Sequence, residues 1–332
     1  MAAVWQSMWI SNSSVWPVEE HPWEERKSSA IVFTSFATLG CLVNCLPIAL
    51  TLTTTLSNNN VNLLVAHMSL VDLFVCLIFV AGQNLYILHK DTLSEIVCTW
   101  IGFVSASCGF QVFAFPAFLS LNRYIALYHS HHYEQWNSRK NVALTVLFSW
   151  MFVTSILLTF TLAGRTGFDD DNDHCCIVVK GSTLWTVYFW FVCMVPIFGL
   201  SDGTVVYCNV KIYRRLKNHA ENRSLSKNVI KQHKELLYFL IIEIIVPIVF
   251  HTVYLIAKFA YVDRRLLLWK QFFTVLYLIN STVRSIIIMT VLAPYRKALL
   301  NVIKRRASLV IEDASLDPKE SLRLVLARTL SP

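Results

Sequence analysis

One arginine stands in the middle of a long apolar run near the C-terminal end of the chain. The run contains the decapeptide INSTVRSIII, residues 279–288, and the arginine is Arg284. A charged side chain at hydrocarbon depth costs several kcal/mol unless it is paired or hydrated, so it marks a functional site. Two acids within other apolar runs, Asp72 and Glu243, are candidate partners. A carboxylate facing a guanidinium fork can form a bidentate, charge-assisted pair.

Three cysteines differ from the other six, which lie inside apolar runs and serve there as small apolar residues. Cys98 opens one apolar run, and Cys175 and Cys176 follow the acidic segment DDDNDH, residues 169–174. If these segments share an oxidising compartment, a disulfide can join Cys98 to Cys175 or to Cys176.

Two short motifs are candidate modification sites. Asn12-Ser13-Ser14 is a glycosylation acceptor, and KRRASL (304–309) places two arginines before Ser308, as basophilic kinases such as protein kinase A prefer. The cluster His129, His131 and His132 has no paired acids, so we assign no metal site. No catalytic set or cofactor is assigned, and we expect neither an enzyme nor a nucleic-acid partner.

The elements that must position these residues are membrane helices. The chain has 332 residues, 55% of them hydrophobic and 15% charged, whereas soluble chains carry about 25% charged residues. A spanning helix needs about 20 mostly apolar residues. Seven stretches qualify, at 29–54, 61–86, 97–128, 141–163, 183–210, 235–260 and 267–292. We therefore predict an all-α, seven-transmembrane helix bundle.

Charge indicates how the bundle is oriented, because Lys and Arg accumulate on the cytoplasmic side. With the N-terminus outside, 19 of the 29 Lys and Arg fall inside and nine outside. Arg26 and Lys27 oppose this orientation locally, because they would flank the first span on the outside. Glycosylation of Asn12 requires the same orientation. We expect a plasma-membrane protein with an outer tail (1–28) and a membrane domain (29–292). An amphipathic helix along the inner lipid interface (293–306) and a cytoplasmic tail (307–332) follow.

Several residues together carry a resemblance to a known family. Asn44, Asp72, Trp150, Pro196 and Pro247 fall in spans one, two, four, five and six, and Arg123 in NRY follows Cys98 by 25 residues. In these features residues 29–303 resemble the rhodopsin-like (class A) G-protein-coupled receptors. The segment NRYIALYHSHHY is locally similar to the melatonin-type receptors.

Three departures make it a divergent member. Ile245 replaces the family's tryptophan before the span-six proline, and Thr204 replaces its span-five tyrosine, with Tyr207 one turn later. Arg284-Ser285-Ile286-Ile287-Ile288 replaces its Asn-Pro-x-x-Tyr motif. Activation at spans six and seven is therefore expected to differ.

The resemblance implies a receptor that binds an extracellular ligand and activates a heterotrimeric G protein. Arg123 would act there with Asn122 and Tyr124. Relatives restrain this arginine with acids, where this chain has Asn122 and Lys227, so we expect high ligand-free signalling. The resemblance also implies that Cys98 is bridged to Cys175 or Cys176.

The resemblance further places a ligand pocket in the outer half of the bundle. Ser105 stands where amine receptors have an acid, which opposes an amine ligand. Leu278 stands where opsins have the lysine that binds retinal, which opposes a retinal Schiff base. An apolar lining suits a neutral small molecule, while the acidic outer loop leaves a basic peptide possible. The candidate lining residues are Ser105, Gly109, Phe110, Trp185, Thr252, Trp269 and Tyr277.

Relatives also place a polar chamber, often holding sodium, beside the span-two acid. Asn280 and Ser281 match that chamber, but Val112 replaces its span-three hydroxyl, and Arg284 stands where relatives have an amide. We expect Arg284 to pair with Asp72 and occupy the sodium site, with Asn280 and Asn44 taking up spare hydrogen bonds.

The alternative is a seven-span ion channel or transporter that uses Glu243, Arg284 and Asp72. A channel of the insect odorant-receptor kind would have its N-terminus inside, which the charge distribution opposes. Transporters are often built from internal repeats, and we find none in this sequence.

Overall fold

The computed structural model describes residues 23–78, 80, 95–163, 166–169, 174–177, 183–188, 191, 195–221, 238, 241–242, 245 and 267–315. Within these ranges the chain is helical apart from one hairpin. The elements are α2 (Trp23–Thr53), η1 (Thr55–Asn58), α3 (Asn60–Ile78), α5 (Glu95–Tyr128), α6 (Ser130–Trp136), α7 (Arg139–Leu162), β1 (Thr166–Asp169), β2 (His174–Ile177), α8 (Thr183–Tyr188), α9 (Val195–Glu221), α11 (Leu267–Val291) and α12 (Ala293–Ser315).

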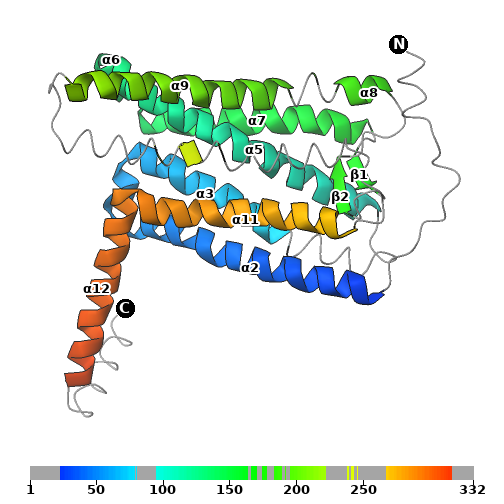
Figure 1. Ribbon diagram of the computed structural model, residues 1–332, viewed down its shortest axis with the longest axis horizontal. Helices are drawn as coiled ribbons and strands as arrows, with labels where there is room; N and C mark the ends of the chain where they lie inside the picture. The colour runs from blue at the N-terminus through cyan, green and yellow to red at the C-terminus, as the bar shows by residue number, and fades with distance from the viewer. Residues whose placement is uncertain are drawn as a thin grey trace, which may run out of the picture.

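The long helices α2, α3, α5, α7, α9 and α11 run side by side along one axis (Figure 1). α5 lies among them and packs against α3, α7 and α9, whereas α11 packs against α2 and α3. Long apolar runs explain the helices, because backbone groups in a bilayer must be satisfied within one segment. Ser138 marks where α7 begins, since its side chain accepts from the Asn141 backbone N–H at 3.3 Å.

Four described helical segments are long and apolar enough to cross a membrane: Ala30–Thr53, Asn60–Ile78, Ile96–Tyr128 and Arg139–Leu162. Leu278–Val291 and Ala293–Lys304 form a fifth candidate if that pair, bent by 81°, is counted as one span. The prediction of a helical, multi-pass membrane protein is confirmed. Predicted span five (183–210) covers α8 and the first part of α9, which continues to Glu221. Most of predicted span six (235–260) lies outside the described residues.

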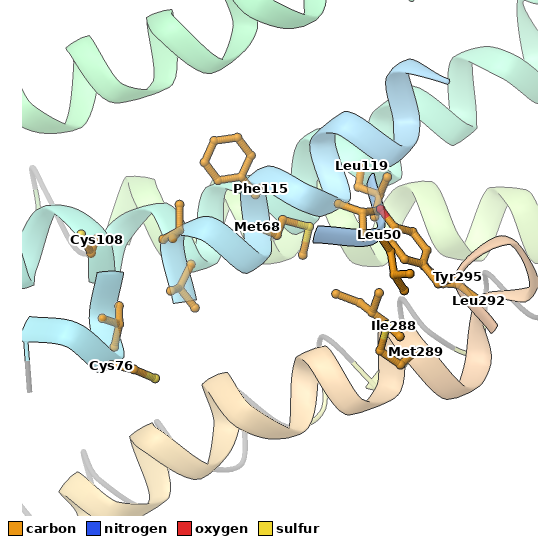
Figure 2. Close-up of a cluster of buried hydrophobic side chains, with 14 of the residues drawn as sticks. Leu50, Met68, Cys76, Cys108, Phe115, Leu119, Ile288, Met289, Leu292 and Tyr295 are labelled. Carbon is orange, nitrogen blue, oxygen red and sulfur yellow. The ribbon is translucent and has the colours of Figure 1, made fainter. Parts of the chain in front are cut away.

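A cluster of apolar side chains fills the centre of the bundle. Figure 2 shows side chains of this cluster from α2, α3, α5, α11 and α12, and among them Leu50, Ile288 and Tyr295 point toward one another. Phe115, Leu119 and Leu278 are fully or almost fully buried. Packing at this density holds the neighbouring polar side chains in fixed positions.

A two-stranded antiparallel hairpin covers one end of α5. β1 pairs with β2 so that Phe168 lies opposite Cys175 and Gly167 opposite Cys176. The Cys98–Cys175 disulfide ties β2 to the start of α5. Of the two predicted pairings, the structure therefore selects Cys175.

Two helices extend past the segments predicted for them. α2 begins at Trp23, inside the predicted outer tail (1–28), and α12 continues to Ser315, nine residues beyond the predicted end at 306. Residues 307–315, ASLVIEDAS, contain neither glycine nor proline, and several are good helix formers, so nothing ends the helix at 306. The first proline after it is Pro318.

Candidate functional site

The arginine in the apolar run has a carboxylate beside it. Arg284 Nη1 on α11 donates to Asp72 on α3, at 3.3 Å from Oδ2 and 3.5 Å from Oδ1. The two side chains are 2% and 0% exposed. A pair removed from solvent in this way is screened little, so its attraction is far stronger than that of a surface pair.

A network of neutral polar side chains links the two helices that carry the pair to α2. Ser285 Oγ donates to Asn44 Oδ1 at 2.5 Å and lies 3.4 Å from Ser69 Oγ. Asn44 Nδ2 donates to the carbonyl oxygens of Gly40 at 2.8 Å and Ser281 at 3.3 Å. The network joins α2, α3 and α11.

The two asparagines expected beside Arg284 are both buried, Asn44 on α2 and Asn280 on α11. Asn44 bonds to the Gly40 and Ser281 carbonyls and to Ser285, and its role beside Arg284 stays a prediction. Ser281 and Val112 are buried as well.

We call Asp72 and Arg284 together the ionic centre. Close packing fixes the helices around it. A Cβ added at Gly40 would lie 2.5 Å from Cys76 Sγ and 2.9 Å from Thr282 Oγ1. Real Cβ atoms essentially never approach other atoms that closely. A glycine is therefore needed where α2 meets α3 and α11.

A second polar group lies where α5 ends. Asn122 Nδ2 donates to Asn137 Oδ1 at 2.9 Å, and the Tyr133 hydroxyl donates to Asn122 Oδ1 at 3.2 Å. Burial raises the pKa of Tyr133, while the nearby Arg123 guanidinium partly opposes the rise. The phenol therefore keeps its proton at neutral pH and can remain the donor.

Arg123 and Tyr124 follow Asn122 on α5. Within the described part of the chain, the buried Nε of Arg123 has no hydrogen-bond partner. The Tyr124 ring stacks on Tyr128 at 4.6 Å between centroids and lies 6.0 Å from the Tyr207 ring on α9. The Tyr128 hydroxyl donates to the Lys211 carbonyl at 3.0 Å. These contacts join α5 to α9 at the end that carries α6 and α12 (Figure 1).

Comparison with known proteins identifies this arrangement. Residues 43–287 match the family described as 7 transmembrane receptor (rhodopsin family). The chain belongs to that family. It is also 22% identical over 208 residues to the G-protein coupled receptor 183-B of Danio rerio, across 61% of this chain and 57% of that protein.

The rhodopsin-family match covers both polar groups. Asp72 and Arg284, and Asn122 and Arg123, all lie within residues 43–287. Trp150, one of the family markers, donates from Nε1 to His67 Nε2 at 3.0 Å and so joins α7 to α3. Among the family departures, Thr204 lies on α9 and Ile245 is exposed.

The predicted pocket residues lie on several elements of this chain. Phe110 is buried, Ser105 and Gly109 are half-buried on α5, Trp185 lies on α8, and Trp269 and Tyr277 lie on α11. Thr252, Glu243 and the glycosylation acceptor Asn12 lie outside the described residues. Ser308 lies within α12.

Sequence reasoning missed several polar residues that the structure brings into these groups. Ser69 and Ser285 belong to the network that links α2, α3 and α11. Each is a hydroxyl within one turn of a charge in an apolar run, a signal that could have identified them. Tyr133 is the last residue of NRYIALYHSHHY, so the local family likeness was a signal for it. Asn137 lies just after α6, where polar residues are expected, and no signal distinguished it.

Proposed function

We propose that this chain is a plasma-membrane receptor with its N-terminus outside, which binds an extracellular ligand and activates a heterotrimeric G protein. One observation carries the proposal. The disulfide-linked hairpin and the Asn122-Arg123-Tyr124 triplet lie at opposite ends of one rhodopsin-family helix, α5. At 1.5 Å per residue, 34 residues make this helix about 50 Å long, enough to join the two membrane faces.

In this proposal the seven predicted spans form one bundle with two arrangements. A ligand favours whichever arrangement it binds more tightly, and the population shifts accordingly. A change of helix packing at the outer end would then alter the surface around Arg123, where the G protein binds.

The ligand is proposed to be a neutral small molecule that lies between the hairpin and the outer part of α5. Ser105, Gly109 and Phe110 supply one wall with little charge, which suits an apolar ligand with few polar groups. A basic peptide attracted by the acidic segment 169–173 is the second possibility.

A second-messenger assay in transfected cells tests the function. The wild-type chain is measured without ligand and then against a panel of neutral lipophilic molecules and basic peptides. Arg123→Ala at matched surface expression is the control. We expect ligand-free output above that of the control, and an increase with a ligand from the panel. Equal output from both proteins through every G-protein class would contradict the function.

The ion pair has a proposed role within this function. The Arg284 guanidinium supplies a fixed positive charge to Asp72, where many relatives bind sodium, so we expect ligand affinity independent of sodium. Binding is measured in sodium chloride and in N-methylglucamine chloride at equal ionic strength. A sodium-dependent affinity in the wild type would contradict this role.

A further inference from the structure

The short helix α6 has almost no packing to hold it in place. All seven of its residues, Ser130–Trp136, are described, and none is buried. His131, Glu134 and Trp136 are exposed, the last to 63%. Isolated helices shorter than about 12 residues are marginal in water, so contacts other than burial must hold α6 against the bundle.

Asn137, the residue after α6, provides those contacts through three hydrogen bonds. Its side-chain Oδ1 accepts from Asn122 on α5 at 2.9 Å. Its carbonyl oxygen accepts from Asn60 Nδ2 at the start of α3. Its backbone N–H donates to the Tyr133 carbonyl at 2.8 Å, which closes the end of α6. One asparagine therefore joins α3, α5 and α6.

Two further bonds strengthen the attachment to α5 and η1. The Tyr133 hydroxyl donates to Asn122 Oδ1 at 3.2 Å, so both polar atoms of the Asn122 amide are engaged. Arg139 Nη2 donates to the Ser57 carbonyl in η1 at 2.9 Å. We call the residues Asn60, Asn122, Tyr133, Asn137 and Arg139 the connector clasp.

We propose that the connector clasp is a positioning device for coupling: it holds Asn122, and so the backbone that carries Arg123, in the uncoupled arrangement, and it opens when the G protein binds. The proposal rests on the proposed function. Asn122 and Arg123 are adjacent on α5, so a restraint on one limits the other. Because three of the five residues are asparagines, the side-chain bonds at the centre of the clasp are neutral.

Neutral bonds suit a restraint that must open. Each neutral hydrogen bond is worth roughly 0.5–1.5 kcal/mol net, which corresponds to about a two- to tenfold change in the ratio of two states. A bond made in one state only biases the molecule toward that state by this factor. The clasp therefore holds the uncoupled state only moderately.

The first experiment measures ligand-free second-messenger output at matched surface expression. Asn137→Ala, and Tyr133→Phe, which loses only a hydroxyl, are each expected to raise output about two- to tenfold. Asn141→Ala is the matched control. Asn141 Nδ2 on α7 donates to the Gln135 carbonyl on α6 at 2.7 Å, a bond that reaches neither α3 nor α5. Output that falls or stays unchanged in the clasp variants would overturn the proposal.

The second experiment needs no G protein. Spin labels carried by unnatural amino acids, which avoid the nine native cysteines, are placed at the exposed residues Asn58 and Glu134 of the full chain in lipid nanodiscs. Asn137→Ala should lengthen and broaden the distance distribution, and Asn141→Ala should not. An unchanged distribution in Asn137→Ala would overturn the clasp. A wild-type chain that activates no G protein would overturn the coupling role together with the proposed function, even if the distances change.

Discussion

The ionic centre and the connector clasp are two polar groups of opposite design. Asp72 and Arg284 are charged, almost fully buried and surrounded by close-packed helices. Asn122 and Asn137 are neutral and half-buried, and they attach a helix that buries none of its residues. Breaking a buried ion pair strands a charge, whereas breaking a neutral bond near water does not. We infer that the ionic centre specifies one helix arrangement and that the clasp permits two.

The largest effect is expected at the ionic centre. Arg284→Ala or Asp72→Ala leaves one uncompensated buried charge and should cost about 3–5 kcal/mol, seen as a sharp loss of surface expression. The double variant removes both charges and should recover part of the loss. Arg296→Ala, at an exposed arginine on α12, is the control. Flow cytometry of an epitope-tagged chain measures the effect, and strictly additive losses would refute the pairing.

Close packing beside the ionic centre gives the next largest effect. Gly40→Ala places a Cβ within 2.5 Å of Cys76 Sγ and should cost about 1–3 kcal/mol by overpacking. A thermal-stability assay of the purified protein measures the loss. Gly203→Ala is the matched control, since its added Cβ meets nothing within 4 Å. Equal stability of the two variants would show that α2 is not confined at Gly40.

Modification of α12 should have a smaller effect, at the end of the bundle that carries the clasp. Phosphorylation of Ser308 adds about −1.5 to −2 charge four residues after Lys304 and should weaken attraction to anionic lipid by about 1–2 kcal/mol. Protein kinase A is applied to the full chain in phosphatidylserine nanodiscs, and hydrogen exchange of α12 is followed. Ser308→Ala is the control. Failure of the kinase to label the wild type, while it labels a standard substrate, would contradict the prediction.

The smallest effect is expected from adding a charge to the clasp itself. Asn122→Asp loses the Nδ2 donor to Asn137 Oδ1, so the Asn137 amide must turn to present its Nδ2 to the new carboxylate. The carboxylate then accepts from both Asn137 and Tyr133 in charge-assisted bonds, a gain of about 1 kcal/mol. The new carboxylate also adjoins Arg123. Ligand-free output at matched expression should therefore fall about fivefold. An increase in output, or no change, would contradict the prediction that a negative charge at position 122 strengthens the clasp.

The sequence predicted the ionic centre better than the clasp, and the reason is physical. Asp72 and Arg284 stand out because charges are rare in apolar runs, and each requires a partner. The family resemblance then favoured one pairing over Glu243. The Cys98 disulfide was narrowed to two partners, but adjacent cysteines cannot be distinguished until the register of the hairpin is known.

The connector and α12 were predicted less well. Asn137 and Tyr133 belong to a polar segment in which many residues could bond to water, so their roles depend on tertiary contacts alone. The end of α12 was placed too early because the composition after 306 was read as polar, although Leu309, Val310 and Ile311 interrupt it. Local helix propensity was the better guide there.

The junction of α11 and α12 makes α12 a lever. The Tyr295 hydroxyl donates to the Asn62 carbonyl at 3.0 Å and lies 2.9 Å from the Thr51 hydroxyl, so the base of α12 is pinned to α2 and α3. From this pivot the 23 residues of α12 extend about 35 Å, at 81° to α11. A rotation of about 5° at the pivot would displace the far end by about 3 Å. A displacement too small to detect inside the packed bundle would thus be amplified where α12 meets its surroundings.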